Sequence, residues 1–108
     1  MHKKKKAVIL WSNTPDRATA EHIARNLVEK RLAACIHILP AGVSIYRWEG
    51  QIQQGEEWTL MIKTRDKKVK QVMSAIKAMH PYDIPEMLAT PVVAGHKNYL
   101  SWIDRETH

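Results

Sequence analysis

The chain has 108 residues, of which 44% are hydrophobic and 26% are charged, and its formal net charge is +6. This length suits one domain with one core, and no apolar run approaches the roughly 20 residues that a membrane helix requires. The single cysteine, Cys35, excludes an intrachain disulfide and a CxxC motif.

Most of the positive charge lies at the N-terminus. Without the four lysines Lys3–Lys6 the net charge falls from +6 to +2. We therefore expect a basic tail over residues 1–6 and one nearly neutral domain over residues 7–108. The apolar stretch that follows the tail, Ala7–Trp11, is too short for the hydrophobic region of a secretory signal. A cytoplasmic location is expected.

The first elements are a strand and a helix. Ala7–Trp11 is continuously apolar, which predicts a central strand covered on both faces. Thr14 is a candidate N-cap and Pro15 suits the first helical position. The helix is expected to continue to about Arg31, because apolar residues recur at helical spacing at Ala20, Ile23, Ala24, Leu27 and Val28.

Two further strands follow the helix. Ala33–Leu39 is predicted to be a strand that is interrupted at 40–42, where Pro and Gly indicate a bulge or bend, and that resumes over Val43–Trp48. Residues 49–57 contain two glycines and little apolar content, so we expect a long hairpin connection there. Trp58–Thr64 is then the third strand.

The last third of the chain predicts two helices and a strand. Lys67–Met79 carries apolar residues at helical spacing. Met87–Val93 reads as a fourth strand, and Pro91 within it favours an edge position. Lys97–Thr107 is expected to be a short C-terminal helix. The predicted order is β-α-β-β-α-β-α.

This order predicts an α+β fold of the ferredoxin-like type, a split β-α-β sandwich. Right-handed crossovers place both long helices on the same face of one antiparallel sheet. The other face is left uncovered. The strands contain more apolar residues than one layer of helices can cover, for example Ile45, Trp48 and Leu60. Large exposed apolar patches usually mark interfaces, so self-association is expected.

The segment His80–Glu86 predicts a stiff connector between the second helix and the fourth strand. Pro81 and Pro85 lack an N–H and bias His80 and Ile84 towards extended geometry. The segment therefore holds an imidazole, a tyrosine and two carboxylates on a rigid loop. Polar groups positioned in this way often serve a binding site.

Four stretches give the chain a family resemblance: Tyr46–Gly50, Met61–Thr64, His80–Glu86 and Tyr99–Ile103. Together with Ala33-Ala34-Cys35 and Thr14-Pro15-Asp16, they make the chain from about Ala7 to Thr107 resemble the CutA family of divalent-cation tolerance proteins. The resemblance implies a ferredoxin-like subunit with an extended hairpin between the second and third strands, a homotrimer, and a link to copper and other divalent metals. It implies no catalytic reaction.

Imidazole and thiolate are the side chains here that suit copper or zinc, and we select His80 and Cys35 as metal candidates. Cys35 and His37 point to the same face of a strand about 7 Å apart. In the family, metal contact is attributed to positions that are Ser12, Met79 and His80 here. Since Ser12 is a poor copper ligand, we expect weak binding of Cu²⁺ or another divalent cation. We also expect that the protein requires no cofactor. Alternatively, His80 only orders its loop and Cys35 is a buried small hydrophobe.

The resemblance also implies a ligand site in clefts between subunits. Lys63 would provide a cation, and aromatic side chains would provide walls, for a small anionic or zwitterionic ligand. The alternative is that the same residues stabilise an interface and that Lys63 and Glu86 form a structural ion pair. The predicted cleft residues are Trp48, Lys63, Tyr82, Glu86, Tyr99 and Trp102.

No GxSxG, GxxxxGK[ST], GxGxxG or HExxH motif occurs, so a non-enzymatic role in metal response or signalling is expected. A small-molecule sensor of the PII type is an alternative. An RNA-binding module is another, but the third strand lacks the Gly-Phe-aromatic signature and the chain has no phenylalanine. We therefore expect neither nucleic acid nor a membrane as partner.

Overall fold

The computed structural model describes residues 6–108, so the first five residues of the expected basic tail lie outside the described part of the chain. The order β-α-β-β-α-β-α is confirmed. The elements are β1 (Ala7–Thr14), α1 (Arg17–Glu29), β2 (Cys35–Trp48), β3 (Gln51–Arg65), the short 3-10 helix η1 (Asp66–Lys68), α2 (Val69–Met79), β4 (Leu88–Pro91) and α3 (Lys97–Glu106).

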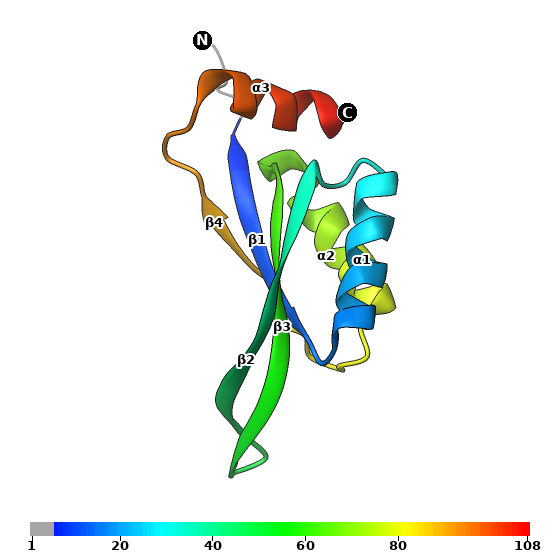
Figure 1. Cartoon of the computed structure of the whole chain (residues 1–108), viewed down its shortest axis with the longest axis vertical. Coiled ribbons are helices and arrows are strands. Elements are labelled where there is room, and N and C mark those ends of the chain that lie inside the picture. Colours follow the sequence, from blue (N-terminus) through cyan, green and yellow to red (C-terminus); the bar gives the residue numbers. More distant parts are fainter. Residues whose placement is uncertain (1–5) are drawn as a thin grey trace.

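The four strands form one antiparallel sheet in the order β2-β3-β1-β4. Helices α1 and α2 lie side by side on one face, and α3 lies across one end of the sheet (Figure 1). This arrangement is the ferredoxin-like fold. The face turned away from α1 and α2 is called the open face below; the register places on it Ile9, Trp11 and Asn13 of β1, Cys35, His37 and Leu39 of β2, and Thr59, Met61, Lys63 and Arg65 of β3.

The core lies between the sheet and the two long helices. Leu10, Leu60 and Ile62 from the central strands contact α1 and α2, and all three are fully buried. Alternation of buried and half-exposed residues along β1 shows that only one face of this strand is fully covered. The expectation that β1 is covered on both faces is therefore wrong for the isolated subunit. Within residues 6–108 no helix has the length and apolar character that crossing a membrane demands.

The start of α1 differs from the prediction. Strand β1 continues to Thr14, and the N-cap is Asp16, whose side chain accepts a hydrogen bond of 2.7 Å from the Thr19 amide. Thr14 instead donates its hydroxyl to the Asp16 carbonyl at 3.0 Å. This hydrogen bond holds the turn that contains Pro15, so the proline precedes the helix instead of opening it. The helix ends at Glu29, before Arg31 with its positive φ of 58°.

The connection between β2 and β3 is much shorter than predicted. Only Glu49 and Gly50 form the turn, with φ values of 49° and 77°, and two consecutive positive φ values are typical of a tight type I′ hairpin. Residues 51–57 are strand and pair with residues 42–48. The expected bulge is confirmed, because the register shifts between Leu39 and Gly42.

Residues 42–57 form a two-stranded projection, called the hairpin arm below. The molecule measures 50 × 25 × 23 Å and its radius of gyration is 14.7 Å, compared with about 13 Å expected for a compact chain of this length. Val43, Ile45 and Ile52 on the arm have exposed fractions of 66%, 70% and 70%. The arm thus extends apolar side chains into solvent in the isolated subunit.

Leu60→Ala tests where the core lies. Leu60 is fully buried between the sheet and the helices, so truncation should lower the free energy of unfolding by about 2–5 kcal/mol. Val93→Ala is the control, because Val93 is 94% exposed and its loss should change stability by no more than about 0.5 kcal/mol. Urea denaturation followed by circular dichroism at one protein concentration measures both. Equal losses would contradict this placement of the core.

Candidate functional site

The loop from His80 to Glu86 is fixed to the sheet by His80. This residue ends α2 with extended geometry, φ −80° and ψ 136°, and its side chain is buried. Its Nδ1 accepts a hydrogen bond of 3.0 Å from the Tyr82 amide, so the ring proton lies on Nε2, which donates to the Asn13 carbonyl at 2.6 Å. Strand β4 pairs with β1 only between Val8 and Trp11. His80 therefore supplies a donor to β1 beyond the end of β4.

Side-chain hydrogen bonds connect this loop to the base of the hairpin arm. The Tyr82 hydroxyl donates to Glu57 Oε2 at 3.1 Å. The Asn13 amide donates to Glu86 Oε1 at 3.3 Å, and its own carbonyl oxygen accepts from the Thr59 hydroxyl at 2.6 Å. These contacts frame a cavity of about 520 Å³, called the hairpin cleft below, which is lined by Asn13, Tyr46, Trp48, Glu57, Tyr82, Asp83, Ile84, Pro85 and Glu86.

The hairpin cleft is acidic and aromatic. Its lining includes three carboxylates, and none of its lining residues is a lysine or arginine. Within residues 6–108, Asp83 is the one of the three that forms an ion pair, with Lys77 of α2, whose Nζ lies 3.8 Å from Asp83 Oδ1. The volume is within the range of small-molecule sites, about 300–1,000 Å³. A group with positive charge and some apolar surface fits this lining best.

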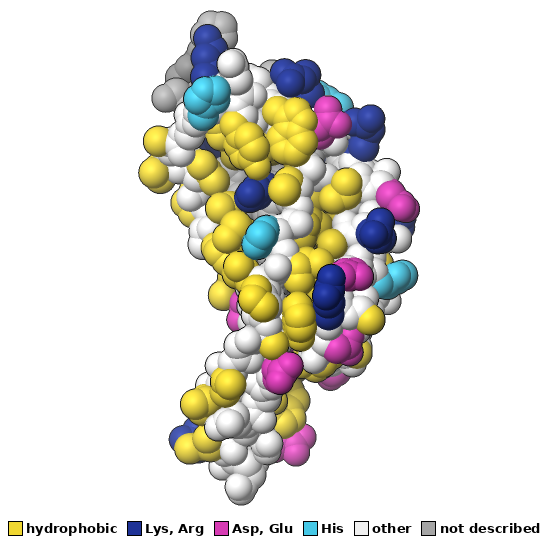
Figure 2. All heavy atoms as spheres, viewed as in Figure 1, with side chains coloured by type: hydrophobic (Ala, Val, Ile, Leu, Met, Phe, Trp, Pro, Cys, Tyr) yellow, Lys and Arg dark blue, Asp and Glu magenta, His cyan; other side chains and the backbone are white. Residues whose placement is uncertain are grey.

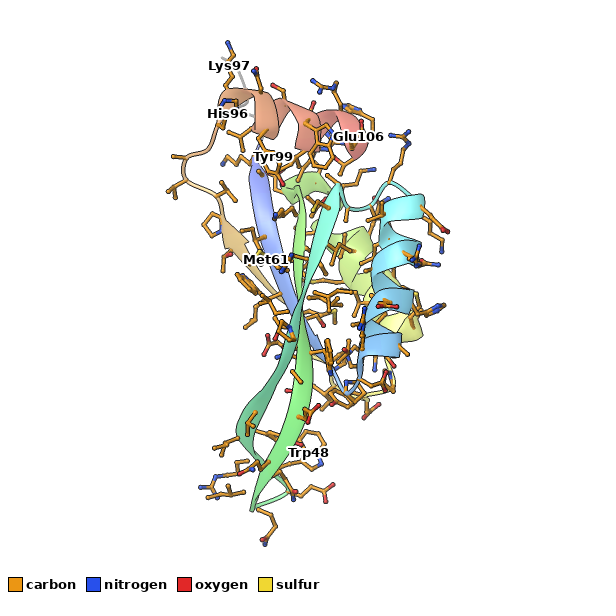
Figure 3. The ribbon with its side chains drawn as sticks, in the orientation of Figure 1. Trp48, Met61, His96, Lys97, Tyr99 and Glu106 are labelled. Carbon is orange, nitrogen blue, oxygen red and sulfur yellow. The ribbon has the colours of Figure 1, made fainter. Side chains whose placement is uncertain are left out.

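A second aromatic group lies at the other end of the sheet and carries positive charge. The Lys63 ammonium lies 5.7 Å from the centroid of the Tyr99 ring, and the rings of Tyr99 and Trp102 are 5.5 Å apart. We call these three residues the α3 patch. In Figure 3 Tyr99 lies on α3 and Trp48 lies on the hairpin arm, with Met61 between them on the sheet.

The six predicted cleft residues therefore form two groups in one subunit. Trp48, Tyr82 and Glu86 line the hairpin cleft, whereas Lys63, Tyr99 and Trp102 form the α3 patch. Within residues 6–108 of one subunit, Lys63 and Glu86 form no ion pair with each other: Lys63 lies over the Tyr99 ring, and Glu86 accepts from Asn13.

Six residues that line the hairpin cleft were not among the predicted cleft residues: Asn13, Tyr46, Glu57, Asp83, Ile84 and Pro85. Glu57 was assigned to a connection, although it belongs to β3. The alternation of polar and apolar residues would have shown that Asn13 and Glu57 share the face of the sheet that carries Trp11.

The metal candidates also lie in different places. Both ring nitrogens of His80 are engaged in hydrogen bonds. Ser12 is fully buried on the helix side of β1, and Met79 packs against the core. Cys35 is a half-buried free thiol on the open face, with His37 two residues further along β2. Within residues 6–108, no three His, Cys, Asp or Glu side chains converge as metal ligands.

Comparisons with known proteins agree with this fold. The family model of the CutA1 divalent ion tolerance protein matches residues 8–106. A divalent-cation tolerance protein CutA from Thermus thermophilus is 41% identical over 99 residues, which are 92% of this chain and 96% of that protein. Crystallised CutA from Xylella fastidiosa has a TM-score of 0.92 and 42% identity, covering 94% of this chain and 98% of its own. A structure described as the periplasmic divalent cation tolerance protein CutA from Archaeoglobus fulgidus has a TM-score of 0.92 and 37% identity, covering 94% and 99%.

Tyr82 gives the hairpin cleft a measurable pH signature. Burial of the phenol, followed by its hydrogen bond to Glu57 and the charge of that carboxylate, raises the pKa of Tyr82 to about 12. The ordinary pKa of a tyrosine side chain, which applies when the chain is unfolded, is 10.0. Tyr82 therefore contributes full stability below pH 10, and this contribution is lost as the pH rises towards 12.

The absorbance of tyrosinate, measured as the difference between the wild type and Tyr82→Phe, reports this ionisation. We expect a step near pH 12 that Glu57→Gln moves towards pH 10, because the substitution removes the carboxylate charge. A Tyr82 step near pH 10 in the wild type would show that the phenol is not held against Glu57.

Proposed function

The chain belongs to the CutA1 divalent ion tolerance family, and we propose that it acts as a non-enzymatic homotrimer whose clefts between subunits bind a metal ion or a small ligand in response to divalent cations. The observation that carries this proposal is the hairpin arm. An isolated two-stranded ribbon is marginally stable in water. The arm exposes Val43, Ile45 and Ile52, and a second copy of the chain is the partner that supplies a cover for all of them.

The sheet has two free edges that suit this assembly. Strands β2 and β4 are the outer strands, and all four residues of β4 are exposed. Hydrophobic side chains also gather over the strands away from α1 and α2 (Figure 2). Pairing β2 of one copy with β4 of the next is a head-to-tail contact, which closes into a ring when the rotation permits. The count of three is the one that the family resemblance implies.

Assembly also offers a ligand site with charge of both signs. The hairpin cleft carries carboxylates and the α3 patch carries Lys63. A contact between copies that joins the two groups would place an ammonium and carboxylates around one space with aromatic walls. A small zwitterion matches this combination, since its carboxylate pairs with Lys63 and its ammonium pairs with Glu57 or Glu86.

For the metal response we propose Cys35 in preference to His80. A metal at His80 would replace one of the two hydrogen bonds that this buried ring makes. The Asn13 carbonyl or the Tyr82 amide would then lose its hydrogen-bond partner, which is unfavourable. The Cys35 thiol is free and half-buried. A reduced thiol also fits the cytoplasm, which we propose as the compartment.

RNA binding receives less support from the sheet. RNA-recognition domains stack bases on aromatic side chains of the two central strands. Of the open-face positions in β1 and β3, Trp11 offers such a ring, but its Nε1–H donates to the Thr90 hydroxyl at 3.1 Å. Its direct cross-strand neighbour, Met61, is aliphatic.

Size-exclusion chromatography with light scattering tests the assembly. We expect a mass of three times the 12.5 kDa chain at micromolar concentration. The double variant Ile45→Lys/Ile52→Lys should dissociate, because it places charges on apolar surface that the neighbouring copy covers. Ala18→Lys, on an exposed position of α1, is the control and should keep the wild-type mass. A wild-type chain that elutes as a monomer would contradict the proposal.

A further inference from the structure

A second cavity lies beside α3, at the end of the sheet opposite the hairpin arm (Figure 1). Its volume is about 240 Å³, and we call it the end pocket. Its lining comes from the start of β1, the end of β3, the loop that precedes α3, and α3 itself. Among the described residues that line it, none lines the hairpin cleft or belongs to the α3 patch. The end pocket is therefore a separate candidate site.

The end pocket has an excess of positive charge. Lys6, Arg65 and Lys97 line it, against one carboxylate, that of Asp104. This carboxylate is already engaged, because Arg65 Nη1 lies 3.6 Å from its Oδ1 and His108 Nε2 lies 3.4 Å from its Oδ2. Within residues 6–108, neither of the two lysines forms an ion pair. A cleft lined mainly by one sign of charge concentrates ligands of the opposite sign.

Arg65 is held in position by the residue that follows α3. Its Nε donates to the Thr107 hydroxyl at 2.9 Å, and its Nη2 donates to the Thr107 carbonyl at 2.7 Å. The Arg65 side chain is only 14% exposed. A guanidinium has five N–H donors, so these two hydrogen bonds leave N–H groups on both Nη1 and Nη2. Arg65 therefore brings oriented donors to the end pocket, and little side-chain entropy is lost when a ligand accepts from them.

The end pocket also has an apolar wall. Ala7, Leu100 and Ile103 contribute to its lining. The backbone of Gly95 approaches Leu100 so closely that a Cβ atom on Gly95 would lie 3.0 Å from Leu100 Cδ2. This close approach fixes the Leu100 side chain against the loop. Ser101 adds a hydroxyl beside the apolar wall. The pocket thus combines cations with a small apolar surface, which suits an anion that carries a short organic group.

We propose that the end pocket binds a small phosphate monoester, with its phosphate among Lys6, Arg65 and Lys97 and its organic group against Leu100. Three cations against one carboxylate leave an excess of two positive charges. A phosphate monoester carries about −1.5 to −2 charges at pH 7 and has three acceptor oxygens, so it matches this excess. A carboxylate or a phosphodiester carries one negative charge and matches it less well. Arginine forks and lysine point charges are the usual protein partners of phosphate.

The head-to-tail contact proposed above uses other surfaces than the end pocket. Lys97, Ser101 and Asp104 are spaced by four and three residues, so they share one side of α3. At 3.6 residues per turn, Tyr99 and Trp102 of the α3 patch lie on roughly the opposite side. Figure 3 shows Lys97 and Tyr99 projecting from the helix in different directions. Among the described lining residues, none belongs to the outer strands β2 and β4. Phosphate binding is therefore independent of the number of subunits.

The experiment is a titration of the full-length protein with ethyl phosphate at neutral pH and low ionic strength, followed by backbone amide chemical shifts. We expect saturable shifts at Gly95, Lys97 and Ser101 that weaken with added salt. Dimethyl phosphate is the matched control ligand, since it is an isomer with one negative charge, and it should bind about tenfold more weakly. Inorganic phosphate lacks the ethyl group and should bind about fourfold more weakly, the effect of one buried CH₂.

Two pairs of variants at exposed positions separate charge from space. Lys97→Gln should weaken ethyl phosphate binding by about fivefold or more, whereas Lys30→Gln, at the end of α1, should not change it. Ser101→Leu fills the pocket and should abolish the shifts, whereas Ser74→Leu on α2 should keep them. The proposal is overturned if ethyl phosphate produces no saturable shifts at the end pocket, if dimethyl phosphate binds as tightly, or if Lys97→Gln and Ser101→Leu both keep the wild-type affinity.

Discussion

The hairpin arm is the feature on which the remainder of the molecule depends. Within residues 6–108, the strands at 42–48 and 51–57 pair with each other and have no third strand beside them. A two-stranded ribbon buries too little apolar surface to be stable by itself in water. Its base is held by Tyr82, which donates to Glu57. The hairpin cleft extends from this contact along the arm to Trp48, which lies next to the turn.

His80 determines the position of the other wall of the cleft. Because its buried ring donates to Asn13 and accepts from Tyr82, it fixes the distance between β1 and the proline loop. The Tyr82 ring lies against it with centroids 4.7 Å apart. Buried polar groups must be satisfied, so the loop cannot move without breaking two hydrogen bonds at once. Pro81 and Pro85 further limit the backbone between these contacts. The cleft wall is thus built as a rigid surface.

The sequence pattern predicted the helices and strands that bury one face in the core. Leu27 and Ile76 mark helices by their periodicity, because each points into the core. The prediction of a loop over residues 51–57 was wrong. Both faces of the hairpin arm are exposed to solvent in one subunit, so its sequence lacks the alternation of apolar and polar residues that indicates a strand. The N-cap was misplaced for a local reason: Thr14 and Asp16 are both good caps, and the hydrogen bond from Thr14 to the Asp16 carbonyl decides between them.

The candidate site was harder to predict, because spacing along the chain does not show which residues meet. The motifs supplied aromatic, carboxylate and lysine candidates, but Lys63 and Glu86 lie in different groups. Pairing in the sheet supplies the missing information. Asn13 and Thr59, for example, are cross-strand partners joined by a hydrogen bond, a contact that their separation along the chain does not reveal.

Charge also constrains how copies of this chain can meet. The hairpin cleft is negative and the α3 patch is positive. A twofold contact is self-complementary, so one made through the hairpin cleft would place carboxylates against carboxylates, and like charges across an interface are costly. A head-to-tail contact is not self-complementary, so it lets the positive α3 patch of one copy meet the negative hairpin cleft of the next. The same direction of contact would also bring the free edge of β2 to that of β4. The opposite charges of the two surfaces and the two outer strands of the sheet are therefore both compatible with a head-to-tail contact.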